Sequence, residues 1–94
     1  MSAEISVTRI GDGDPIVFDA CVREGKSETR HRVTLARADF VRLNGGATAE
    51  ALIESAFRFL LDREPKESIL AHFDVSVIGR YFPEFEEKLP DYFR

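Results

Sequence analysis

The chain of 94 residues has little of several residue types on which chemistry or membrane insertion depends. It contains one cysteine, two histidines and no tryptophan. A single cysteine excludes an intramolecular disulfide and cannot build a metal cage by itself. Its purely apolar runs stop at about three residues, far short of the roughly 20 that a membrane-spanning helix needs. We therefore expect no membrane segment, no metal site and no cofactor.

The N-terminus lacks the basic stretch and the apolar run of a secretory signal. Together with the scarcity of cysteine, this predicts a cytoplasmic protein. The composition is 44% hydrophobic and 32% charged, which is ordinary for a globular chain with a packed core. We expect residues 1–94 to form a single domain.

An excess of positive charge is also lacking. The net charge is −4, and all of it comes from the second half of the chain, since the first half is balanced. Nucleic-acid-binding domains are usually basic, so this balance disfavours nucleic acid as the partner.

Residues 1–36 alternate between apolar and polar side chains with the period of a β-strand. The alternating runs are centred on Ile5–Val7, Ile16–Arg23 and Arg30–Leu35. Turn-forming residues separate them at Gly11–Pro15 and Glu24–Glu28. The pattern predicts a three-stranded antiparallel meander.

The parity of the apolar positions restricts the register of the second and third strands. The inward set is even-numbered on the second strand and odd-numbered on the third, so the connecting loop needs an even number of residues. A two-residue turn at Gly25–Lys26 places Ala20 opposite His31. A four-residue loop places Val22 opposite His31 instead, and both registers keep one face apolar.

Residues 37–94 form the helical half, which ends in an aromatic-rich segment. The central helix begins at Ala49, with Thr48 as its N-cap, and ends before Pro65. We expect short helices on either side of it, and Asp74–Phe82 fits either a helix or an extended segment. The remaining expected helices are Arg37–Asn44, Pro65–His72 and one or two turns within Pro83–Leu89. The first of these is expected to bury Ala38, Leu43 and either Val41 or Phe40.

The central helix has an apolar arc of roughly 200°, about twice what packing against one surface needs. The apolar face of the meander is expected to cover one flank of Ala49–Leu61, and Phe73–Leu89 the other. The predicted fold is therefore α+β, with the N-terminal meander packed on a central amphipathic helix and two or three short flanking helices.

None of the reactive side chains falls in a catalytic or metal-binding pattern. His31 lies on the apolar face of the third strand, and His72 in the last turn of a predicted helix, without metal-ligand spacing between them. Cys21 is expected on the outer sheet face, without a readable base. We expect a protein that is not an enzyme.

Two groups of residues are candidates for binding a partner. The arginines of the sheet face and the adjoining helix would suit an acidic protein segment, whereas the terminal aromatics would anchor an interface. The candidate residues are Arg23, Arg30, Arg32, Arg37, Arg42, Tyr92 and Phe93.

The sequence thus predicts a small non-enzymatic protein-interaction or regulatory domain, with a protein partner or a second copy of itself. The alternative is nucleic-acid binding, through the arginine-bearing sheet face or through residues 68–82. That segment loosely resembles a helix-turn-helix, although Pro83 would end its second helix early.

Overall fold

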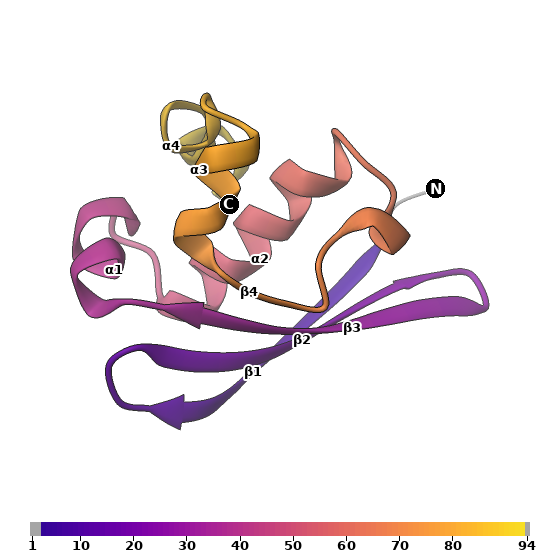
Figure 1. Cartoon of the computed structure of the whole chain (residues 1–94), viewed down its shortest axis with the longest axis horizontal. Helices are drawn as coiled ribbons and strands as arrows, with labels where there is room; N and C mark the ends of the chain where they lie inside the picture. Colours follow the sequence, from indigo (N-terminus) through magenta and orange to yellow (C-terminus); the bar gives the residue numbers. More distant parts are fainter. Residues whose placement is uncertain (1–2, 94) are drawn as a thin grey trace.

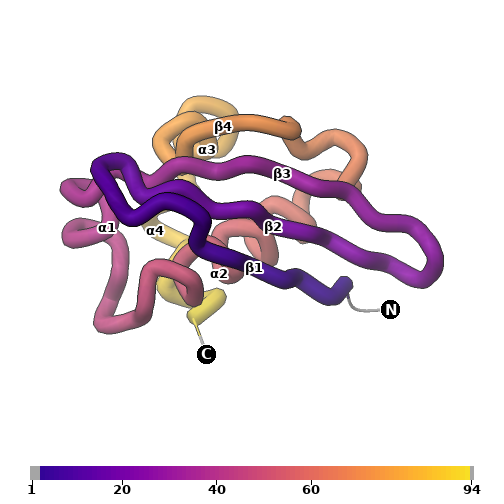
Figure 2. The backbone as a smooth tube through the Cα atoms, turned by 90° about the horizontal axis from the view of Figure 1, so that it is seen from below, coloured from indigo at the N-terminus to yellow at the C-terminus, as the bar shows by residue number. Residues whose placement is uncertain are grey.

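The computed structural model describes residues 3–93, which have the predicted α+β architecture. Strands β1 (Glu4–Asp12), β2 (Ile16–Glu24) and β3 (Ser27–Leu35) form the antiparallel meander. A fourth, short strand extends the sheet in the order β1-β2-β3-β4. The described helices all lie on one face of this sheet (Figure 1). Figure 2, seen from below, has the strands in front of the helices, so the opposite sheet face is bare of the described helices.

The turn between β2 and β3 has two residues, which decides between the two predicted registers. Ala20 faces His31, as the shorter loop requires. Gly25 takes a φ of 60°, and no residue other than glycine has a positive φ within residues 3–93. A positive φ at the first loop residue alone is the pattern of a type II′ hairpin turn.

Gly25→Ala is expected to destabilise the protein by about 1 kcal/mol, because alanine pays a steric cost at positive φ. A Cβ at Gly25 would meet no atom within 4 Å, so the backbone alone sets this cost. Gly79 lies inside a helix and is equally unobstructed. The matched Gly79→Ala should therefore stabilise by about 0.5–1 kcal/mol. Urea unfolding of the two variants checks this, and the same sign for both would contradict it.

The short helix α1 (Arg37–Leu43) forms where it was predicted, but its contact face differs in part. Of the two candidates for burial, Phe40 packs against the core and Val41 is 74% exposed. Leu43 is half-buried beside Phe40. The expectation that Ala38 would be buried is wrong, because none of the residues of α1 is fully buried.

The central helix α2 (Ala49–Leu61) begins at Thr48, whose hydroxyl accepts a hydrogen bond from Ala51 N at 3.1 Å. Both flanks of its apolar arc are covered, as expected. Phe57 faces the sheet, with its ring 5.2 Å from that of His31. Phe59 faces the C-terminal segment, and its ring centroid lies 5.0 Å from that of Phe85.

The predicted helix over Pro65–His72 is wrong. Only a 3-10 turn, η1 (Lys66–Ser68), forms there, and the chain then extends into β4 (His72–Asp74), which runs parallel to β3. His72 is therefore an exposed strand residue and not a helix-end residue.

Contacts with β3 and with the end of the hairpin explain the extended conformation of this segment. Arg32 N donates to Ala71 O at 2.7 Å, and His31 Nδ1 bonds Leu70 O at the same distance. The ammonium of Lys66, a buried residue, lies 3.2 Å from Glu24 and so ties η1 to the hairpin. These bonds replace those that a helix over this segment would have made.

The rest of the chain forms α3 (Val75–Tyr81), α4 (Phe85–Lys88) and the 3-10 turn η2 (Leu89–Tyr92). The ambiguous segment 74–82 is thus helical from Val75. Because 68–73 holds no α-helix, residues 68–82 have one α-helix instead of two, and they lack the geometry of a helix-turn-helix.

Candidate functional site

The predicted arginine face lies on the bare side of the sheet, over a broad hollow of about 560 Å³. Arg23, Arg30 and Arg32 all line this hollow, so the structure brings these three residues together. Each has a carboxylate partner. Glu28 lies 3.2 Å from Arg23 and 3.0 Å from Arg30, and Asp19 lies 3.1 Å from Arg32.

Glu28 is the carboxylate shared by two arginines. The hydrogen bonds donated by Arg23 and then by Arg30 lower the pKa of Glu28 below its usual value, so this carboxyl is ionised at neutral pH. The three arginines are thus offset by Glu28 and Asp19 on the same face. A phosphate backbone would have to displace these acids, and among the described residues no phenylalanine, tyrosine or tryptophan lines the hollow for a base to stack on.

Arg37 and Arg42 lie on α1, and both serve the fold. The guanidinium of Arg37 donates to Gly13 O at 2.9 Å and to Asp12 O at 2.7 Å, and so closes the turn between β1 and β2. Arg42 pairs with Asp39 at 2.8 Å and with Glu86 of α4. These two arginines do not join the other three around the hollow.

Cys21, Asp19, His31 and His72 also border the hollow, but they do not form a catalytic group. The imidazole of His31 is buried on the inner side, where Leu70 O and Thr29 are its partners. Cys21 lies on β2 and His72 on β4, two strand spacings or about 10 Å apart. A nucleophile and its base need hydrogen-bond contact of about 3 Å.

Tyr92 and Phe93 are half-buried and pack against the core. The hydroxyl of Tyr92 donates to Asp62 Oδ2 at 2.6 Å and accepts from Arg63 Nη1 at 3.3 Å. Ser55 Oγ donates to the carbonyl oxygen of Tyr92 at 3.2 Å. These bonds hold the C-terminal segment against α2, and the part of each ring that stays exposed is all that a partner could reach.

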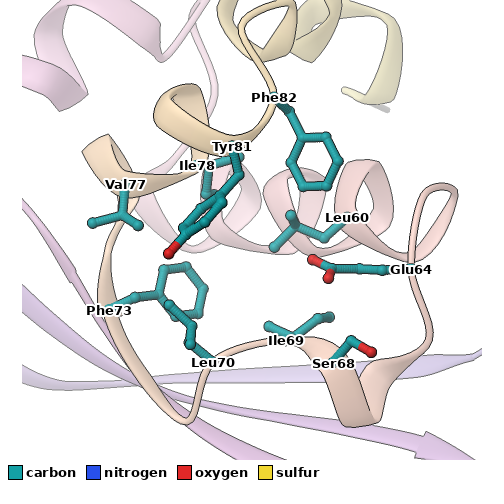
Figure 3. A pocket seen from close by; sticks show the side chains of 10 residues that line it. All are labelled: Leu60, Glu64, Ser68, Ile69, Leu70, Phe73, Val77, Ile78, Tyr81 and Phe82. Carbon is teal, nitrogen blue, oxygen red and sulfur yellow. The ribbon is translucent and has the colours of Figure 1, made fainter.

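A second cavity, an apolar groove of about 220 Å³, lies on the helical side of the molecule between α2, α3 and the η1–β4 segment (Figure 3). Leu60 forms part of its floor. One side is formed by Ile69, Leu70 and Phe73 from the η1–β4 segment. Val77 and Tyr81, one helical turn apart on α3, form another.

Local sequence features fix the walls of the groove. Asp74 caps α3 by accepting from Ser76 N at 3.0 Å, and it also accepts a hydrogen bond from the Thr34 hydroxyl of β3. Burial raises the pKa of Asp74, but the hydrogen bonds from Thr34 and Ser76 outweigh that effect and lower it overall. Asp74 therefore anchors the start of α3 to the sheet in its ionised form.

Two large apolar side chains at the groove remain in contact with water. Leu70 is 48% exposed and Tyr81 is 68% exposed. Apolar residues that are exposed together beside a concave surface are typical of an interaction site.

Glu64 is the charged residue of the groove, and its carboxylate points inward from the side opposite Tyr81 (Figure 3). Within residues 3–93 this carboxylate forms no ion pair. Burial raises the pKa of Glu64 above its usual value, because the apolar walls disfavour the charged form. A cation brought next to Glu64 would relieve that cost.

Sequence reasoning did not find this groove. It assigned Ile69, Leu70 and Phe73 to a helix and treated Tyr81 as part of the cover for α2. The available signal was the density of apolar residues over 69–82, which exceeds what covering one helix flank requires.

No protein-family model, curated protein or solved structure matches this chain. Across residues 3–93, the helices are all too short or too polar to cross a bilayer.

Proposed function

We propose that this chain is a non-enzymatic protein-interaction domain and that the groove beside α3 is its binding surface. The observation that carries the proposal is the size and lining of the groove. Its volume of about 220 Å³ is below the roughly 300–1,000 Å³ of sites for cofactors and drug-sized ligands. It suits one anchoring side chain of a protein partner, and such anchors supply most of the energy of an interface.

The exposed side chains at the groove support the same reading. Leu70 and Tyr81 lose contact with water when an apolar side chain enters between them, and each buried Å² contributes about 25 cal/mol. The arginine face has less support, because its three arginines already pair with Glu28 and Asp19. Nucleic-acid binding through those arginines is therefore the weaker proposal.

The test uses a probe of the proposed anchor, N-acetyl-phenylalaninamide, titrated into labelled protein and followed by NMR. We expect saturable shifts of the Leu60, Ile69 and Val77 methyl signals, with a Kd in the millimolar range, about 1–10 mM for one side chain. N-acetyl-glycinamide should cause no such shifts.

A pair of variants controls for nonspecific binding. Leu70→Glu puts a charge at the groove, whereas Val41→Glu puts the same charge on α1, and both side chains are exposed in the native protein. Only Leu70→Glu should abolish the shifts. Binding that is equal in both variants, or absent in the native protein, would overturn the proposed function.

A further inference from the structure

Two side chains beside the groove, Tyr81 and Arg80, have the properties expected of its occupant: an apolar ring and a positive charge. Tyr81 is the most exposed aromatic residue at the groove. In Figure 3 its ring lies across the groove from the carboxylate of Glu64. A tyrosine presents a large apolar ring with little loss of conformational freedom, so it is a favoured interface anchor.

Arg80 supplies a positive charge that could pair with the negative charge of Glu64. Among residues 3–93 it is the only arginine that forms no ion pair, whereas the other eight all have carboxylate partners. It is exposed. Arg80 follows Val77 by three positions and Tyr81 follows it by four, so all three lie on neighbouring parts of the α3 surface.

We propose that the occupant of the groove is a second copy of this chain, in a twofold dimer. The exposed part of each Tyr81 ring packs into the partner's groove while its inner part stays a wall of its own groove, and Arg80 pairs with the partner's Glu64. The inference rests on the proposed function, because it identifies the occupant of the same groove.

Charge and symmetry favour a second copy over an unrelated protein. In a twofold interface the same patch must complement itself, so one patch has to supply both the anchor and its receptor. This patch supplies an exposed tyrosine with an apolar groove, and an unpaired arginine with an unpaired glutamate. The anchor, the receptor and the ion pair therefore each occur twice in the dimer.

The expected dimer is weak and reversible. Each copy contributes one anchor, and a contact centred on α3 falls in the size range of transient interfaces, below about 1,200 Å² in total. We expect a Kd of about 10–500 µM. Because the ion pair is at the rim, raising the salt concentration should weaken the dimer moderately.

Sedimentation equilibrium of the full chain, from about 10 µM to 1 mM, tests the proposal. The native protein should shift from monomer to dimer mass across that range. Tyr81→Ala should weaken the dimer about tenfold or more, as loss of an anchor does. Val41→Ala, which removes a side chain of similar exposure on α1, should leave it unchanged.

A charge exchange tests the pairing directly. Glu64→Arg and Arg80→Glu alone place like charges together and should each weaken the dimer, and the double variant should recover most of the loss. Circular dichroism verifies that each variant is folded. The dimer proposal would be overturned if the native protein stayed monomeric at 1 mM, or if Tyr81→Ala left the Kd of the dimer unchanged.

The probe titration separates failure of the dimer from failure of the proposed function. If the protein is monomeric but still binds N-acetyl-phenylalaninamide, the dimer is refuted and the interaction groove stands. If that monomer also bound N-acetyl-Phe-Arg-amide more tightly than N-acetyl-Phe-Glu-amide, the occupant would be a basic segment of another protein. If the protein neither dimerises nor binds the probe, the dimer and the proposed function are both refuted.

Discussion

Phe59→Ala is expected to cost about 3–5 kcal/mol of unfolding free energy, the range for removing a buried phenylalanine ring. Phe59 is fully buried on the flank of α2 that faces away from the sheet. Its ring meets those of Phe82, Phe85 and Tyr92, with centroid distances of 5.9, 5.0 and 5.8 Å. The guanidinium of Arg63 lies 3.6 Å above the same ring.

The large cost follows from how many segments meet at this one side chain. Phe82 directly follows α3, Phe85 begins α4 and Tyr92 ends η2, so each part of the C-terminal segment has a ring on Phe59. Total stabilities of small domains are about 5–15 kcal/mol, which makes the expected loss a large fraction of the whole. The groove should open as well, because Phe82 and Leu60 line it.

Urea unfolding measures the loss, and limited proteolysis shows where it is felt. Cleavage should concentrate after residue 81, while the meander stays protected. Val41→Ala is the control and should change the free energy by less than about 0.5 kcal/mol. A loss below about 1 kcal/mol for Phe59→Ala would show that something else holds the C-terminal segment.

The meander and its register follow from the sequence because their determinants are local. The even parity of Phe18 and Ala20 and the odd parity of His31 and Val33 demanded an even loop, and the structure selects the two-residue loop from the two that this left open. The Asp19–Arg32 pair followed from that register. The pairing of Glu28 with Arg23 lies in the same register, since the two residues face each other across the strands.

Strand β4 could not be predicted in the same way. It has three residues, and its hydrogen bonds go to β3, some 40 positions earlier in the chain. Taken alone, residues 65–72 are compatible with a helix, and only their contacts with β3 and the hairpin hold them extended. Tertiary contacts overrode local propensity here.

The groove escaped prediction for the same physical reason. Its walls come from α2, the η1–β4 segment and α3, and a hollow between three elements leaves no periodic signal in any of them. The sequence places Leu70 on a helix and Tyr81 in the cover of α2, and only the packing shows that both remain exposed. The sequence likewise does not show that Glu64 and Arg80 form no ion pair within residues 3–93, which only the folded structure reveals.

His31→Phe is expected to destabilise the protein by about 1–3 kcal/mol, although it keeps an aromatic ring at this position. His31 is 4% exposed, and its ring packs on Phe57. A carbonyl oxygen only accepts, so Nδ1 donates to Leu70 O at 2.7 Å, and Nε2 forms a hydrogen bond with the Thr29 hydroxyl at 2.8 Å. Phenylalanine keeps an aromatic ring against Phe57 but leaves the carbonyl of Leu70 without its donor.

The loss of local stability around Leu70 should exceed the loss of global stability, because Leu70 lies at the point where the chain leaves η1 and approaches β3. Hydrogen exchange should accelerate at the amide of Arg32, which bonds Ala71 O, and little at the amides that join β1 to β2. Thr29→Val is the matched control, since it removes only the bond to Nε2 at a half-exposed site and should cost less than about 1 kcal/mol. Equal costs for the two variants would contradict the assignment of the larger share to Leu70. If His31→Phe also weakened binding of N-acetyl-phenylalaninamide, the buried histidine would be the residue that holds this side of the groove in place.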